Sequence, residues 1–250
     1  MRFLGKCGVL FFSVFLLLSA DLAAAAGPSR EELIEMPAAA VVTGRNVNFR
    51  SEPSTKGKIL GRFGEGQAWE ELLVVDAASG EDGHLWYKAL SEHFGEGWIS
   101  GRYLRFEGLD DQLWRFFLLV RRDFGTTPAM TERLLGKPLK IERQTFRPED
   151  FSKDVTSVEM LYPEGKVIYW LIDMIPFLVE LDFEGGARGF GPISFGDGPE
   201  KVEQVLGDPH DVRSWVWTYH SGMQRIHVGF RLGPNDEVKV ARLLFERDAY

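Results

Sequence analysis

The sequence predicts a β-rich chain: a small all-β barrel followed by an α+β unit of two tandem helix-plus-antiparallel-meander repeats. Two observations predict it. Residues 41–104 alternate short apolar runs with glycine turns and lack a helical period, and closure into a barrel removes the exposed edges of short strands. Residues 124–138 recur as residues 195–209 at a constant offset of 71 residues (195 − 124), which is typical of a duplicated structural unit.

The first 26 residues have the organisation of a secretory signal. Arg2 and Lys6 give a basic start, residues 9–18 form an apolar run interrupted only by Ser13, and the small residues Ala24, Ala25 and Ala26 precede residue 27. The run is too short for a membrane span. The sequence therefore predicts a periplasmic or secreted protein with no stable membrane span after cleavage, with an uncleaved anchor as the alternative.

Cysteine usage and charge narrow the class further. Cys7 is the only cysteine and it precedes the apolar run, so the mature chain has no thiol for a disulfide, a metal ion or nucleophilic catalysis. Export without disulfides is ordinary for a bacterial protein. The net charge is −8, with both signs mixed along the chain, whereas nucleic-acid binding requires a basic stripe. We therefore expect no nucleic-acid partner.

The chain between the signal and residue 106 is expected to hold a linker and the barrel. Residues 27–38 are polar with proline and alanine, which favours a linker, and a helical turn at 30–34 is the alternative. Residues 39–106 are the predicted barrel. Strands are expected where apolar residues alternate or where Val and Leu cluster, at residues 41–43, 47–50, 58–63, 67–76, 86–89 and 98–100.

The stretch Asn48-Phe49-Arg50-Ser51-Glu52-Pro53-Ser54 resembles the N-V-R-S-G-P-S signature of bacterial SH3-type domains. Further matches follow in the family's order at Ile59-Leu60-Gly61, Gly66, Trp86-Tyr87-Lys88, Gly97-Trp98-Ile99 and Tyr103-Leu104. The resemblance implies an SH3-like barrel that binds cell-wall peptidoglycan, its peptides or an envelope protein, without catalysis. Glu52 replaces the family's glycine and the loop of residues 76–85 is long, so the family's ligand is not carried over directly.

Aromatic side chains are the candidate ligand contacts of this domain, because rings offer a large rigid area with a polar handle. Trp69 stands beside two glutamates and is the candidate for an exposed ring. Trp86 and Trp98 have an alternative role as core residues, and Arg50 is expected to hold its turn. The candidate ligand-binding set is Trp69, Trp86, Tyr87, Trp98 and Tyr103.

Residues 107–250 are predicted to form the repeat domain, with repeats at about 117–184 and 189–250. Apolar residues at i, i+3, i+4 and i+7 predict a helix over residues 112–122 that docks between the barrel and the repeats. Residues 185–191 are glycine-rich and are expected to be a hinge between the repeats.

Each repeat is expected to begin with a helix, because Pro128 and Pro199 suit a first helical position and Gly136 and Gly207 suit a helix end. Strands are expected at 157–161, 166–172 and 177–183 in one repeat and at 215–219, 225–231 and 238–245 in the other. Trp215, Trp217 and Tyr219 alternate on one strand face and are the candidate contacts with a protein partner.

The second copy, with Gly196, Val202, Leu206, Gly207 and Pro209, resembles the G-M-T-x-x-x-V-x-x-x-L-G-x-P pattern of α+β domains of the outer-membrane-assembly lipoprotein type. Their fold is related to that of the β-lactamase inhibitor protein. The first copy departs from the pattern, with Thr131 in place of Val. The resemblance implies a scaffold for protein contacts, or a proteinaceous inhibitor of an exported enzyme.

No motif for catalysis, a metal or a cofactor stands out. The five histidines show neither H-x-x-x-H nor H-E-x-x-H spacing, and His84 and His93 are interpreted as loop residues rather than metal ligands. We therefore expect an exported binding protein that is not an enzyme and needs no cofactor. The alternative is a carboxylate-dependent cell-wall hydrolase that uses Asp173, in an apolar strand, with Glu180 and Asp182.

Overall fold

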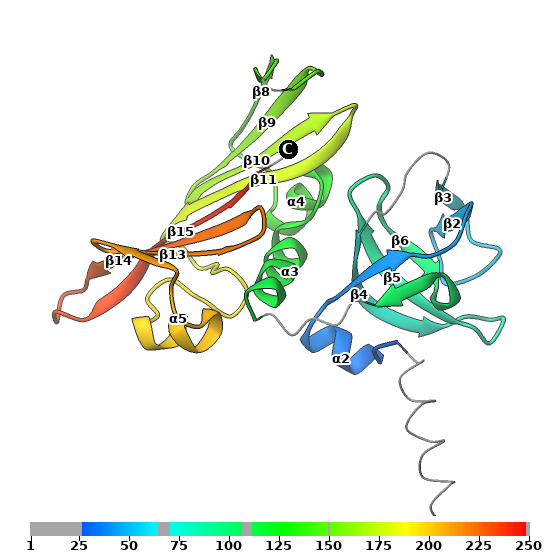
Figure 1. Cartoon of the computed structure of the whole chain (residues 1–250), viewed down its shortest axis with the longest axis horizontal. Coiled ribbons are helices and arrows are strands. Elements are labelled where there is room, and N and C mark those ends of the chain that lie inside the picture. The colour runs from blue at the N-terminus through cyan, green and yellow to red at the C-terminus, as the bar shows by residue number, and fades with distance from the viewer. Residues whose placement is uncertain (1–26, 65–70, 107–111, 150, 249–250) are drawn as a thin grey trace, which may run out of the picture.

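The computed structural model describes residues 27–64, 71–106, 112–149 and 151–248. These residues form two antiparallel sheets, of seven and eight strands, with few helices (Figure 1). The predicted β-rich class is confirmed. Residues 1–26, with the expected signal, and Trp69 lie outside the described residues. Within the described ranges, no helix has the length and apolar character that crossing a membrane requires.

The expected linker contains a helix, α2 Arg30–Glu35. Ser29 and Glu32 form a capping box, in which each side chain accepts a hydrogen bond from the other's backbone N–H. Leu33 is fully buried in the core of the seven-stranded sheet, and Arg30 pairs with Asp76 of that sheet. Because one buried leucine and one cap fix this short segment, it belongs to the folded unit and is not a free linker.

The seven-stranded sheet has the ladder order β3-β2-β6-β5-β4-β1-β7. Alternating side chains such as Val47, Phe49, Leu72 and Tyr87 fill its core. Its strands are β1 Ala38–Val42, β2 Val47–Arg50, β3 Ile59–Phe63, β4 Glu71–Ser79, β5 Leu85–Ser91, β6 Gly95–Ser100 and β7 Leu104–Phe106.

The expected closed barrel is not seen. Strands β3 and β7 are the two ends of the ladder, and within the described residues no pairing joins them. The single pair of β2 with β6, Arg50 opposite Trp98, is the weakest link. The sheet therefore curls around its core without closing. Short strands gave no signal for closure, because closure depends on pairing between distant edges and not on the pattern within a strand.

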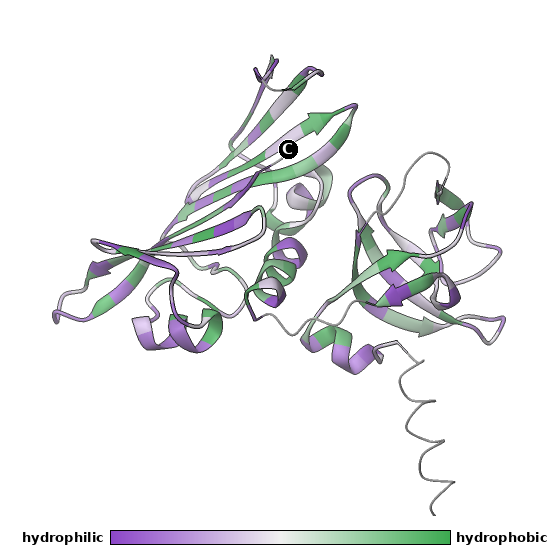
Figure 2. Ribbon diagram, viewed as in Figure 1, coloured by the Kyte–Doolittle hydropathy of each residue, from purple (hydrophilic) through white to green (hydrophobic). Residues whose placement is uncertain are grey.

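The eight-stranded sheet has the order β12-β13-β14-β15-β11-β10-β9-β8. Its strands alternate in hydropathy (Figure 2), and their apolar face packs against the helices α3 Gln112–Phe124, α4 Pro128–Leu135 and α5 Pro199–Leu206. The strands are β8 Lys140–Phe146, β9 Val155–Tyr162, β10 Gly165–Ile172, β11 Ile175–Glu184, β12 Asp211–Arg213, β13 Val216–Ser221, β14 Gln224–Leu232 and β15 Val238–Arg247.

The two short helices begin and end where the sequence predicts. Pro128 and Pro199 occupy the first turn, and Gly136 and Gly207 follow the last with positive φ angles of 87° and 77°. Four strands follow each helix, one more than expected. The additional strands, β8 and β12, are the two edges of the sheet, and β15 pairs with β11 at its centre.

Helix α3 lies between the two sheets, as predicted (Figure 1). Its Leu118 packs with Leu73 and Leu90 of the seven-stranded sheet and with Met130 of α4. Beside this cluster Arg121, only 6% exposed, pairs with Glu71 at 2.9 Å and Glu92 at 3.5 Å. Arg247 of β15 reaches the same Glu92 at 2.7 Å. We call this apolar and ionic contact the joint.

Candidate functional site

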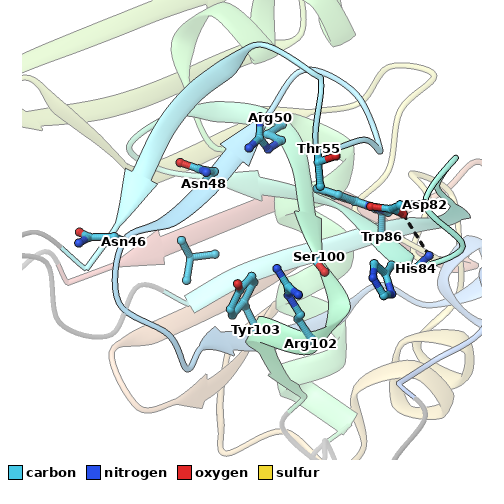
Figure 3. Close-up of a pocket in the computed structure, with 11 residues that line it drawn as sticks. Asn46, Asn48, Arg50, Thr55, Asp82, His84, Trp86, Ser100, Arg102 and Tyr103 are labelled. Atoms are coloured by element: carbon cyan, nitrogen blue, oxygen red, sulfur yellow. Dashed lines mark hydrogen bonds between the residues drawn. The ribbon is translucent and has the colours of Figure 1, made fainter.

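A hollow of about 80 Å³ opens on the seven-stranded sheet between β2, the loop before β5 and the 3-10 turn Gly101–Tyr103 (Figure 3). The register of β5 with β6, which places Trp86 opposite Ser100, sets one wall. We call this space the first hollow. The side chains that give it chemical character are Asn48, Arg50, Asp82, Trp86, Arg102 and Tyr103.

Asp82 fixes the loop beside the first hollow. Its carboxylate accepts a hydrogen bond from the backbone N–H of His84 at 3.1 Å and from Trp86 Nε1 at 3.3 Å. The His84 hydrogen bond is the main reason that the pKa of Asp82 lies below its usual range, although partial desolvation opposes it. This carboxylate is therefore ionised at neutral pH and engaged by the loop.

Two arginines line the first hollow on different elements. Arg50 Nη1 donates to the carbonyl of Gly57 at 2.7 Å, which holds the turn after β2 as expected. Arg102 lies over the ring of Tyr103, with 4.6 Å from Cζ to the ring centroid. Stacking uses the face of a guanidinium and leaves the N–H groups at its edge free to donate.

A second hollow, of about 600 Å³, adjoins the first and shares His84, Ser100 and Arg102 with it. Its apolar wall consists of Tyr87 and Phe106, whose rings meet edge to face at 4.9 Å. Its lining also includes Gly27, Pro28, Leu104 and Arg105. Because three residues are common to both, the hollows form one site with a narrow and a wide end.

The Tyr87 hydroxyl is a buried polar group without a hydrogen-bond partner among the described residues. Tyr87 is 1% exposed, and burial raises the pKa of its phenol. Gly27 packs directly on it, because a Cβ built on Gly27 would lie 2.6 Å from the hydroxyl oxygen. The segment that precedes α2 therefore passes this close to Tyr87 only because residue 27 is a glycine.

The structure brings together three of the five ligand candidates. Trp86 and Tyr103 line the first hollow and Tyr87 lines the second. Trp86 and Tyr87 are also buried core residues, so each of these rings both fills the core and lines a hollow. Trp98 is half-buried opposite Arg50 and Lys88 and lines neither hollow. Trp69 falls outside the described residues.

The three partner candidates do not share a surface. Trp215 is 49% exposed and lies in the turn before β13, with Ser214 at a φ of 55°. Trp217 packs edge to face on Phe230 at 4.8 Å, and Tyr219 is fully buried. The predicted alternation therefore describes the core face of β13. Trp215 instead belongs to the turn of the β12–β13 hairpin, in which Val212 and Val216 are also exposed.

The carboxylates of the alternative hydrolase are each held by a cation. Asp173 lies in the turn after β10, exposed and paired with Lys153, and is not buried in a strand. Glu180 pairs with Lys166 at 2.8 Å, and Asp182 accepts two hydrogen bonds from Arg242 at 2.8 and 2.7 Å. Within the described residues, no three His, Cys, Asp or Glu side chains gather as a metal site.

No protein-family model, curated protein or solved structure matches the chain, so its own geometry carries the functional argument. The site has aromatic walls, arginines at its narrow end and no pair of carboxylates aimed at a common point. Aromatic walls and arginine donors together suit a ligand that has both apolar and negatively charged groups. Sequence reasoning found Trp86, Tyr87 and Tyr103 but missed Phe106, Arg102 and Arg105, although the two arginines flank Tyr103-Leu104 in the sequence. His84, interpreted as a loop residue, lines both hollows.

Proposed function

We propose that this chain is an exported, non-catalytic binding protein whose seven-stranded sheet binds peptide of the bacterial cell wall. The supporting observation is that residues of the SH3-type resemblance meet in space. Asn48 and Arg50 of the signature line the first hollow together with Trp86 and Tyr103, which lie 36 (86 − 50) and 53 (103 − 50) residues beyond Arg50. Packing of the core does not by itself require that the polar residues Asn48 and Arg50 line the same hollow as these two aromatic residues.

The shape and chemistry of the site support a peptide ligand. The ring of Phe106, supported edge to face by Tyr87, offers apolar contact, and arginine edges offer hydrogen-bond donors for carbonyl and carboxylate oxygens. The site lies on the seven-stranded sheet and includes Trp86, Tyr87 and Tyr103, three of the residues that the SH3-type resemblance suggested as ligand contacts. A periplasmic or secreted location follows from the expected signal at residues 1–26.

The test is retention of the mature protein on purified peptidoglycan. Tyr103→Ala removes a ring of the first hollow and the support of Arg102, while the backbone carbonyl of Tyr103 keeps its hydrogen bond from Thr43. We expect wild type to be retained and Tyr103→Ala to be released. Trp215→Ala is the matched control and should be retained. Loss of the wild type, or equal retention of both variants, contradicts the proposal.

A second role is proposed for the eight-stranded sheet, as two tandem α+β repeats that engage a protein partner. Its supporting observation is that Val212, Trp215 and Val216, all in the hairpin at the short edge, are exposed apolar residues. An exported enzyme inhibited by this edge is the alternative form of the same contact. Chemical cross-linking in periplasmic extract should give an adduct that Trp215→Ala loses and Tyr103→Ala keeps. An adduct unaffected by Trp215→Ala contradicts this role.

A further inference from the structure

The site on the seven-stranded sheet is positively charged in an acidic protein. Arg50, Arg102 and Arg105 line the two hollows and Asp82 is the acidic residue among their lining side chains, although the chain carries a net charge of −8. Asp82 already accepts hydrogen bonds from His84 and Trp86. A local concentration of positive charge on a chain with a negative net charge indicates a negatively charged ligand.

The three arginines are not used by the fold as ion pairs. In the part of the chain that the structure describes, cations of this sheet pair as Lys56 with Glu81 and Lys88 with Glu96, while no ion pair includes Arg50, Arg102 or Arg105. Arg102 is exposed and belongs to both hollows. It is the cation nearest to the junction between the narrow and wide ends.

Arg102 is placed beside an aromatic ring at the edge of the first hollow. It lies over Tyr103, with 4.6 Å from Cζ to the ring centroid, and the edge of a guanidinium can donate two parallel hydrogen bonds to a carboxylate. The first hollow, of about 80 Å³, is much smaller than the second, of about 600 Å³. A carboxylate, a group of three heavy atoms, suits this narrow end.

The wide end suits the rest of a short peptide. Its volume of about 600 Å³ lies in the range of small-molecule sites, and Tyr87 with Phe106 gives it an apolar wall. The Tyr87 hydroxyl is buried beneath Gly27, so this tyrosine supports the Phe106 ring rather than bonding to the peptide.

We infer that the two hollows form one site for a short peptide of the cell wall with a free carboxylate, which Arg102 binds at the narrow end. The inference rests on the proposed wall-binding function and adds what part of the wall is recognised. A free carboxylate marks a peptide end that is not cross-linked, because cross-linking converts it to an amide. The protein therefore distinguishes uncross-linked peptide ends from cross-linked ones.

The experiment is a calorimetric titration of the mature protein with a soluble wall tetrapeptide, first with its free carboxylates and then with the same groups as carboxamides. We expect the acid form to bind about tenfold more tightly, as one charge-assisted bidentate contact provides. Arg102→Ala should lower this ratio to about one. Arg102→Lys should give an intermediate ratio of acid to amide affinity, because lysine keeps the positive charge but lacks the two parallel N–H donors of a guanidinium.

Arg213→Ala is the matched control, because it removes one positive charge from a side chain that is 85% exposed on the other sheet. It should leave the tenfold ratio unchanged. Equal binding of acid and amide by wild type, or an unchanged ratio in Arg102→Ala, overturns the inference. An unrelated tetrapeptide acid that binds as tightly as the wall peptide also overturns it, in favour of a protein C-terminus.

Failure of the inference and failure of the proposed function can be told apart. If wild type binds neither soluble tetrapeptide, the carboxylate inference is wrong whatever the peptidoglycan result. If Arg102→Ala is still retained on peptidoglycan while Tyr103→Ala is released, wall binding stands without carboxylate recognition. If wild type is not retained on peptidoglycan, the proposed function itself is wrong.

Discussion

Thr131 shows why one residue departs from an otherwise repeated pattern. In the second copy the matching position is Val202, and both side chains are fully buried. The Thr131 hydroxyl lies 2.6 Å from the Tyr169 hydroxyl and also bonds to the carbonyl of Phe124. Burial raises the pKa of the Tyr169 phenol, so this group stays neutral as a hydrogen-bonding partner. The threonine therefore satisfies a buried tyrosine that the second copy lacks.

Replacement of Thr131 by valine should destabilise the protein, although valine is the residue of the matching position. The change removes the hydroxyl and leaves the Phe124 carbonyl with one partner fewer, at a cost of about 1–3 kcal/mol. Urea unfolding at neutral pH measures it. Thr145→Val is the control, since Thr145 is exposed and bonds only to Thr156, and should change stability by less than about 0.5 kcal/mol. Equal effects would contradict this account.

The Thr131 position also marks a limit of sequence reasoning at the residue scale. Its departure from the repeat was visible in the sequence, but its reason was not, because Tyr169 is 38 residues away. Arg102 shows the same limit. Its neighbour Tyr103 was predicted as a ligand contact, yet the stacking of the two and their place between two hollows depend on the register of β5 with β6.

Elements with local signals were predicted well. The helices α4 and α5 begin at prolines and end at glycines, because φ restriction and positive φ are properties of single residues. Strands β8 and β12 were missed. Most residues of both are exposed, so no alternation of apolar and polar residues marks them. They are held as edges by pairing with β9 and β13, which the local sequence does not encode.

Replacement of Gly136 by alanine tests the backbone role of the helix end. Gly136 has a φ of 87° and a ψ of −177°, a conformation that glycine alone adopts readily, and a Cβ there would meet no atom within 4 Å, so the expected loss of about 1–3 kcal/mol is purely conformational. Thermal unfolding followed by circular dichroism measures it. Gly233→Ala is the control, because its φ is outside the positive range and its nearest neighbour is at 3.4 Å. A Gly136→Ala protein as stable as wild type would contradict the assignment.

At the scale of the whole molecule, the sequence predicted two β-rich units with a helix between them but not how firmly they are attached. The apolar pattern of α3 predicted that it docks between the two units. The ionic part of the joint gave no such signal, because charged side chains at a helix end are ordinarily exposed. Glu71, Glu92 and Arg247 come to it from three other strands or loops, and such convergence follows only from the tertiary arrangement.

The joint predicts that the two sheets unfold together. Leu118 is fully buried between them, and Arg121 bridges Glu71 and Glu92 in a setting from which water is largely excluded. Truncating the leucine costs about 2–5 kcal/mol, and removing the arginine takes a cationic partner from two carboxylates.

Wild type should show one calorimetric transition. The double variant Leu118→Ala/Arg121→Met should show two, one for each sheet, because its cost falls on the contact between them. Val228→Ala, which creates a cavity inside the eight-stranded sheet alone, should lower stability yet keep a single transition. Two transitions in wild type, or one in the double variant, would mean that the joint does not couple the sheets and that the peptide site can move independently of the partner edge.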